Sequence, residues 1–105
     1  MPGALKREPY RIEFTPDANA HVKGLGAGDR AALFDSVFLQ LSHEPAIMTR
    51  NRKRMRHNPL ASHRLRIGDL RVYYDVEDTA RVVTIRAVGI KVRNRVLVAG
   101  KEIEL

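Results

Sequence analysis

Arginine and lysine are the side chains of this sequence best placed to do chemistry, because eight of the 19 gather in one stretch of 22 residues. The 105 residues carry a net charge of +7. The window from Arg50 to Arg71 holds eight basic residues against one acid, Asp69, so the whole excess lies there. Such concentrated charge predicts a polyanionic partner, either a nucleic acid or an acidic protein segment. A solvated basic loop without a partner is the alternative.

The residues around Gly68-Asp69 predict a β-hairpin that orders part of this charge. Residues 63–67 and 70–76 alternate apolar and polar side chains, as half-buried strands do. Glycine at the first central position suits a type II′ turn. A two-residue turn sets the register and divides the side chains between two faces. The predicted basic face carries Arg64, Arg66, Arg71 and Tyr73.

Extending this register to the next strand predicts a third arginine beside the first two. A four-residue loop pairs Val76 with Arg81, and Arg71 then faces Arg86. Like charges directly opposite destabilise a sheet, so a row of Arg66, Arg71 and Arg86 indicates an anion between them. Arginine matches phosphate oxygens bidentately, and a neighbouring tyrosine offers a stacking face or a hydroxyl. The alternative is that the arginine stems merely cover an exposed sheet face.

Histidine is the side chain whose charge changes near neutral pH, which makes His57 the best candidate acid or base. It lies in the basic link of residues 46–59, which has no periodicity and is predicted to be a loop. A solvated loop histidine is the alternative. Tyr74 falls on the apolar face and is expected in the core. Structural positions are also expected for the other histidines, His21, His43 and His63.

The elements that must position these residues begin with one strand and two helices. Residues 10–14 alternate as a strand. Thr15 is a good N-cap before a proline, which predicts a short helix to Lys23. A second helix, capped by Asp29, carries an apolar stripe at spacings of three and four and ends before Pro45. The two helices are expected to form an antiparallel hairpin that lies on a sheet.

The remaining pattern completes one small domain over residues 1–105. Strands are predicted at 81–88 and 95–98, after the hairpin. The order β-α-α-β-β-β-β indicates an α+β fold with an antiparallel sheet. The chain has no cysteine, which excludes disulfides, cysteine-based metal sites and thiol catalysis. No apolar run approaches the ~18 residues of a membrane span, and no secretory signal is evident, so the cytoplasm is expected.

None of the common cofactor or metal motifs occurs. The sequence has no glycine-rich phosphate loop, metal-ligand pair, nucleophile elbow or serine triad. We therefore expect no cofactor, no metal and no membrane partner. Phosphodiester chemistry without a metal remains possible.

Taken together, these segments resemble the RelE/ParE superfamily of bacterial toxin-antitoxin toxins. The resemblance covers nearly the whole chain and lies in YRIEFTPDA, LSHEP, NRKRMR, HRLRIGDLRVYYDV and VVTIRAVGIKVRNRV. It implies a microbial-ribonuclease-like sheet and a type II toxin held inactive by an antitoxin that wraps it. The RelE branch is implied to cleave messenger RNA in the ribosomal A site, where basic residues help the 2′-hydroxyl attack the adjacent phosphate. The ParE branch instead poisons DNA gyrase and has no nuclease site.

The resemblance also implies roles for single residues. Arg64 and Arg66 fall where the RelE branch has paired basic residues, usually lysines. Arg71 falls on its central arginine, and Lys91 on the basic residue that follows the Val-Gly pair. Leu97 falls near a C-terminal tyrosine and cannot supply a hydroxyl or a stacking ring.

The departures from the family pattern affect proton transfer more than phosphate binding. Arginine stays protonated, so proton transfer is left to His57, Lys91 or Tyr73. The favoured reading is a ribosome-dependent, metal-independent messenger endoribonuclease that inhibits translation. A ParE-like gyrase inhibitor and a catalytically degenerate RNA-binding module are the alternatives. The residues expected to bind RNA are Arg50, Arg52, Lys53, Arg54, Arg56, Tyr73, Arg86, Arg93 and Arg95.

Overall fold

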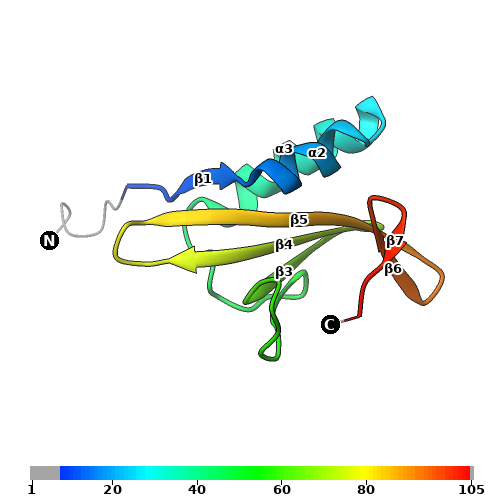
Figure 1. The fold of residues 1–105 in the computed structure, drawn as a ribbon. Coiled ribbons are helices and arrows are strands. Elements are labelled where there is room, and N and C mark those ends of the chain that lie inside the picture. Colours follow the sequence, from blue (N-terminus) through cyan, green and yellow to red (C-terminus); the bar gives the residue numbers. More distant parts are fainter. Residues whose placement is uncertain (1–7, 105) are drawn as a thin grey trace, which may run out of the picture.

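Two helices lie on one side of a sheet in the computed structural model, which describes residues 8–104 (Figure 1). The elements are β1 (Arg11–Phe14), α2 (Pro16–Lys23), α3 (Ala27–Leu41), β2 (Arg52–Arg54), β3 (His63–Ile67), β4 (Leu70–Glu77), β5 (Val82–Val92), β6 (Arg95–Val98) and β7 (Lys101–Glu102). Neither helix of the described residues has the length and apolar character needed to cross a membrane.

The helices begin where side-chain and backbone caps allow them to. The Thr15 Oγ1 accepts a hydrogen bond of 3.1 Å from the backbone N–H of Ala18, so the predicted cap of α2 is confirmed. Helix α3 begins at Ala27, two residues before the predicted cap Asp29, and Gly26 is its N-cap. Asp29 lies in the first turn instead, where a carboxylate is favoured by the helix dipole.

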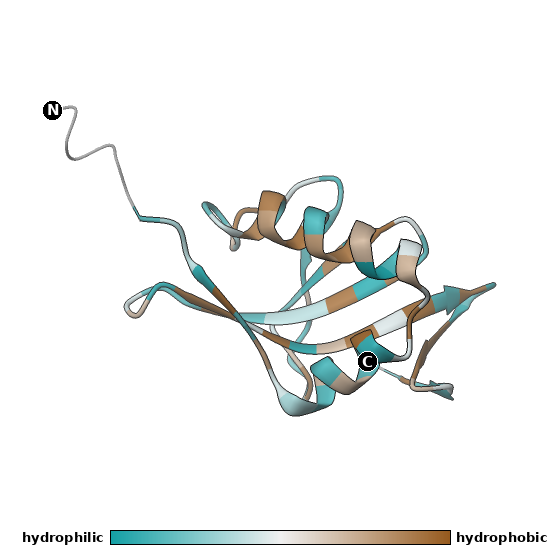
Figure 2. Ribbon diagram, turned by 90° about the horizontal axis from the view of Figure 1, so that it is seen from above, coloured by the Kyte–Doolittle hydropathy of each residue, from teal (hydrophilic) through white to brown (hydrophobic). Residues whose placement is uncertain are grey.

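The sheet confirms the predicted α+β class and adds one parallel pair. Its main path runs β2-β3-β4-β5-β6-β7 with antiparallel neighbours, and β1 pairs parallel with β5. In Figure 2, hydrophobic and hydrophilic stretches alternate along the long helix α3, as expected for a helix that covers a sheet. The core between helices and sheet consists of Ala18, Val22, Leu33, Val37, Leu41, Leu65, Leu70, Val72, Tyr74, Val83, Ile85 and Val88.

The hairpin of β3 and β4 has the predicted register. Ile67 pairs with Leu70, and Arg66 faces Arg71. Gly68 has φ of +57°, the positive value that its turn position requires. The turn therefore fixes which arginines share a face.

The predicted register between β4 and β5 is wrong. Val76 pairs with Val83 rather than with Arg81, because the connecting loop begins and ends one residue later than expected. A β-bulge then shifts the pairing again, so that Arg71 lies opposite Gly89 and Arg86 is the extra residue of the bulge. The predicted row of three arginines does not exist.

Part of the basic link, predicted to be a loop, forms the edge strand β2. Lys53 pairs with Arg64 of β3. An edge strand with polar side chains on both faces shows no alternation of apolar and polar residues, which is why the pattern did not reveal it. The strand holds the basic link against the sheet.

Candidate anion-binding face

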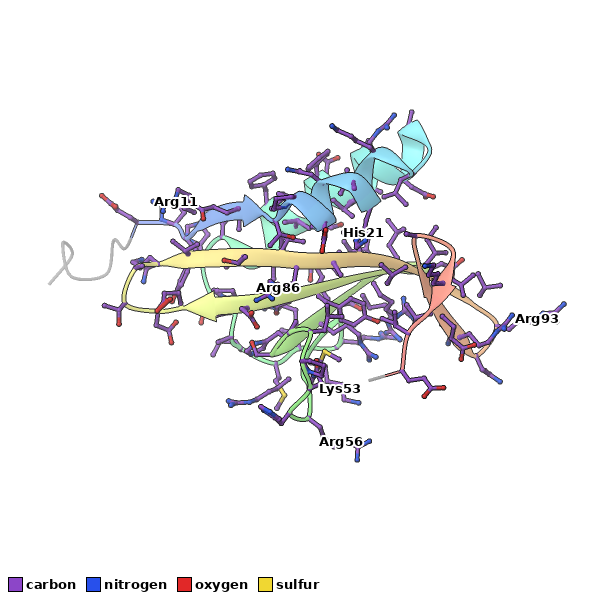
Figure 3. The ribbon with its side chains drawn as sticks, in the orientation of Figure 1. Arg11, His21, Lys53, Arg56, Arg86 and Arg93 are labelled. Atoms are coloured by element: carbon purple, nitrogen blue, oxygen red, sulfur yellow. The ribbon has the colours of Figure 1, made fainter. Side chains whose placement is uncertain are left out.

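The face of the sheet opposite the helices carries most of the concentrated positive charge. Figure 3 shows Lys53, Arg56 and Arg86 on this side, whereas His21 lies on the helix side. Three hollows follow one another over this basic face. The first, the turn hollow, is lined by Arg50, Asn51, Arg66, Gly68, Asp69, Arg71 and Lys91.

The turn hollow brings together cations from three separate segments. Arg66 and Arg71 are a directly opposed pair on β3 and β4. Lys91 comes from the far end of β5, where its backbone N–H donates to the Asp69 carbonyl at 2.7 Å. The Arg66 backbone N–H donates to the Asn51 carbonyl at 2.8 Å, which holds the link with Arg50 at the rim. Four cations thus surround one hollow.

Arg71 is the fixed member of this group. Arg71 is 6% exposed, and its Nη1 donates to the carbonyls of Gly68 at 2.8 Å and Leu70 at 3.0 Å. Burial lowers the pKa of Arg71, and the nearby charges of Arg64 and Arg66 lower it further. Both hydrogen-bond partners are neutral carbonyls, which do not offset the repulsion between Arg71 and the charges of Arg64 and Arg66. An anion bound in the hollow would relieve that repulsion.

Gly89, the glycine of the Val-Gly pair, lies where a larger residue would not fit. A Cβ atom there would lie 2.8 Å from Cγ1 of Val96, and 3.0 Å from both the Leu97 carbonyl and Cγ2 of Val98. Because Gly89 lies opposite Arg71, its missing side chain lets β6 pack closely beside the turn hollow. Sequence reasoning noticed this glycine but not its packing role.

Tyr73 is on the predicted face, but its predicted stacking role is wrong. It is 2% exposed and forms a small second core with Ala61 and Ala87, against which Met55 and Leu60 pack. An aromatic ring in the middle of a sheet face attracts an apolar cover, and the basic link supplies part of it beside Val96, Val98 and Ile103. Burial also raises the pKa of Tyr73 above its ordinary value of 10, which makes its hydroxyl a weaker acid.

Arg64 lines a second hollow, the middle hollow, and not the turn hollow. It is lined by Lys53, Arg54, Met55, Arg56, Asn58 and Arg64. Arg52, predicted to bind RNA, points elsewhere: its Nη1 donates to the carbonyls of Gln40, at 2.9 Å, and Glu44. Its guanidinium therefore ties the basic link to the end of α3.

The third hollow, the loop hollow, contains the candidate base His57. Its other lining residues are Arg54, Met55, Arg56, Asn58, Pro59, Leu60, Ala61, Ser62, Asp75 and Arg86. His57 is exposed there and lines neither of the other two hollows. The predicted catalytic residues are thus divided: Arg66, Arg71 and Lys91 share the turn hollow, and His57 does not join them.

The remaining predicted site residues lie apart from these hollows. Arg93 stands at the turn between β5 and β6 with φ of +59°, at the far end of the molecule in Figure 3. Arg95 pairs with Glu102 at 3.5 Å. Both are exposed. Sequence reasoning missed Asp75, the one acid of the loop hollow, and Asn58, although an Asn before a proline is a turn signal.

Leu97 faces the helix side of the sheet. It lines an apolar hollow with residues of α2 and β5, among them His21, Val88 and Ile90. The His21 Nδ1 accepts a hydrogen bond of 3.2 Å from the Val88 backbone N–H, which confirms the structural position expected for this histidine.

Tyr74 and His63 are also in the core, stacked on each other, and the Tyr74 hydroxyl donates to the Pro45 carbonyl at 2.8 Å. Within residues 8–104, no three His, Asp or Glu side chains gather as metal ligands.

Comparisons with known proteins place this fold. No protein-family model and no curated protein sequence matches the chain. The structure is similar to a chain of the toxin-antitoxin complex RelBE2 from Mycobacterium tuberculosis, with a TM-score of 0.69 and 29% sequence identity. The similarity covers 79% of this chain and 99% of that chain. The predicted resemblance is confirmed at the level of the fold, which is similar to that of a chain from this toxin-antitoxin complex.

Proposed function

We propose that this chain is the toxin of a type II toxin-antitoxin system and cleaves messenger RNA on the ribosome, in the cytoplasm. The observation that carries the proposal is the turn hollow. Four cations converge there, and the buried Arg71 donates to the carbonyls of Gly68 and Leu70. Such a site suits the phosphodiester of a single strand.

The chemistry needs charge stabilisation and two proton transfers. The RNA 2′-oxygen loses its proton and bonds to phosphorus, the bond from phosphorus to the 5′-oxygen breaks, and the 5′-oxygen takes up a proton. Arg66 and Arg71 would stabilise the charge that develops on the phosphate oxygens. Among the cations of the turn hollow, Lys91 is the one that can exchange a proton, since arginine stays protonated.

An induction experiment tests this function. We expect that expression without an antitoxin stops translation before DNA replication, measured by pulse labelling with methionine and thymidine. Messenger RNA mapped at its new ends should show cleavage inside translated frames. Arg66→Ala should remove both effects, because Arg66 is exposed in the turn hollow and its loss leaves the fold intact. Normal methionine incorporation during growth arrest would contradict messenger cleavage.

Arg11→Ala is the matched control for this experiment. Arg11 is an exposed arginine of β1 that pairs with Glu13 at 2.7 Å, and it lines none of the three hollows. It lies at the opposite end of the molecule from Arg93 in Figure 3. The variant removes the same charge and should keep full toxicity.

Gyrase inhibition without chemistry is the second candidate. Leu97, near the position of the family tyrosine, lines an apolar hollow on the helix side, and His57 lies outside the turn hollow. Both observations reduce the groups available for proton transfer. A DNA-damage response that precedes the loss of translation on induction would favour this candidate.

An antitoxin is the protein partner implied by the proposal, since the similar chain comes from a toxin-antitoxin complex. We expect a segment that is acidic where it meets Arg50 to Arg71 and apolar where it covers the helices or a sheet edge. Titration from low to high salt should weaken RNA binding steeply and antitoxin binding much less. Equal slopes would mean that the antitoxin is held by charge alone.

A further inference from the structure

We propose that the loop hollow is a second phosphodiester subsite, for a neighbouring part of the RNA strand whose scissile phosphate occupies the turn hollow. Arg54, Arg56 and Arg86 would contact the strand, and Asp75 would position them. The inference rests on the proposed function, because it assumes that the turn hollow binds RNA.

Asp75 joins the three segments that form the loop hollow. Its Oδ1 accepts a hydrogen bond of 2.8 Å from the Ser62 backbone N–H, at the end of the basic link. Its Oδ2 accepts one of 3.0 Å from Nη1 of Arg86, in the bulge of β5. A single carboxylate on β4 therefore fixes both the link and the arginine.

The link itself is held in one shape by Asn58. The Asn58 Oδ1 accepts from the backbone N–H groups of Leu60 at 2.8 Å and Ala61 at 3.1 Å. Its Nδ2 donates to the carbonyls of Arg56 at 2.7 Å and Ala61 at 3.0 Å. Met55 and Leu60 pack on the second core. The arginines of this link thus start from a preorganised backbone, which reduces the entropy cost of binding.

The bulge directs Arg86 toward this hollow. Tyr73 pairs with Ala87 and Tyr74 with Ile85, so Arg86 is the additional residue between the two pairs. Its side chain is 42% exposed although it pairs with Asp75. A guanidinium has five N–H donors, and the bond to Asp75 uses one of them. The remaining donors leave Arg86 able to bind a phosphate.

A chain of cations connects the two subsites. Asp75 lies four residues from Arg71 along β4, which is about 13 Å at the usual rise of a strand. The middle hollow, with Lys53 and Arg64, shares Arg54 and Arg56 with the loop hollow. A single RNA strand that runs from the turn hollow across the middle hollow to the loop hollow therefore lies along positive charge over its whole path to Arg86.

Binding of RNAs of two lengths tests the subsite. The probes are a dinucleotide and a longer single strand of the same repeated sequence, both with 2′-O-methyl groups that prevent cleavage. We expect Arg86→Gln to weaken binding of the longer strand roughly tenfold, the value of one charge-assisted contact, and to leave dinucleotide binding unchanged. For the longer strand, the slope of the logarithm of the binding constant against the logarithm of the salt concentration should be shallower in this variant by roughly 0.7, the value of one phosphate contact. Arg66→Gln should weaken both probes.

Asp75→Ala separates positioning from simple repulsion. If Asp75 positions the subsite, its removal weakens binding of the longer strand, even though the protein loses a negative charge. If Asp75 only repels RNA, the same variant binds more tightly. Asp35→Ala, on the exposed side of α3, is the control for the change of one charge, and hydrogen exchange of residues 55–62 should rise in Asp75→Ala alone.

The possible outcomes distinguish the two proposals. Loss of binding in Arg66→Gln with no effect of Arg86→Gln at either length overturns the second subsite and leaves the proposed function standing. No effect of either variant overturns both. An Arg86→Gln variant that binds RNA normally but loses affinity for an acidic peptide would assign the loop hollow to a protein partner, and the subsite would be wrong.

Discussion

The turn hollow and the loop hollow both carry net positive charge but are built differently. In the turn hollow, Arg71 is buried and held by two carbonyls of its own hairpin. In the loop hollow, Arg86 is exposed and held by a carboxylate. A cation with neutral partners keeps its full charge for a ligand, whereas one paired with an acid has part of its charge already balanced.

This contrast suggests a division of labour under the proposed function. The turn hollow has a higher net charge than the loop hollow and also contains Lys91, so it suits the step in which charge develops on the phosphate. The loop hollow has a partly neutralised arginine on a preorganised link, so it suits a ground-state contact that lowers KM. Two basic regions of one face therefore need not contribute to the same step.

The largest expected effect comes from proton transfer. Lys91→Ala should lower the cleavage rate about 100- to 10,000-fold, the usual contribution of a general acid or base. His57→Ala should change it by less than about tenfold, because His57 lies in the loop hollow. Single-turnover cleavage of a ribosome-bound message measures both. A larger loss in His57→Ala would reverse the assignment of the two hollows.

Arg71 provides the next test. Arg71→Ala should slow cleavage roughly 30- to 1,000-fold, which corresponds to about 2 to 4 kcal/mol of transition-state stabilisation. It also removes the hydrogen bonds to Gly68 and Leu70, so thermal unfolding must be measured beside activity. Arg71→Lys keeps the charge and should recover part of the rate. Full activity of a folded Arg71→Ala protein would exclude the turn hollow as the reaction site.

Packing beside the turn hollow is expected to affect the cleavage rate less than Lys91 and Arg71 do. Its effect should be measurable in the free energy of unfolding. Gly89→Ala places a methyl group 2.8 Å from Cγ1 of Val96, and overpacking of this kind costs about 1 to 3 kcal/mol. Gly28→Ala is the control, because a Cβ in that first turn of α3 meets nothing within 4 Å. Denaturant unfolding should show a lower midpoint for Gly89→Ala only. Equal midpoints would mean that β6 does not pack as described.

The smallest expected effect is a dependence of stability on pH. Burial, with the charge of Arg54, lowers the pKa of His63 below its ordinary value of 6.5. The unfolded chain therefore binds the proton more readily, and stability that is complete above pH 6.5 declines as the pH falls toward the folded-state pKa. His63→Phe should flatten this decline in denaturant midpoints measured from neutral to acid pH. An unchanged slope would mean that another group causes it.

The sequence determined the features that depend on neighbouring residues. The turn at Gly68-Asp69 connects two adjacent strands, so the facing of Arg66 and Arg71 follows from two turn residues and strict alternation. The Thr15 cap is local for the same reason. The excess of charge between Arg50 and Arg71 is a property of composition and needed no structure.

Tertiary structure decided the features that depend on distant segments. The bulge at Arg86 lies in β5, which pairs with β4 and also with β1 and β6, and no local sequence pattern predicts it. The cover over Tyr73 comes from Met55 and Leu60 of the link together with Val96, Val98 and Ile103 near the end of the chain. The buried position of Arg71 among carbonyls likewise appears only when the sheet is assembled. Local sequence selects turns and faces, whereas register across long loops and burial are settled by packing between elements that are far apart in the chain.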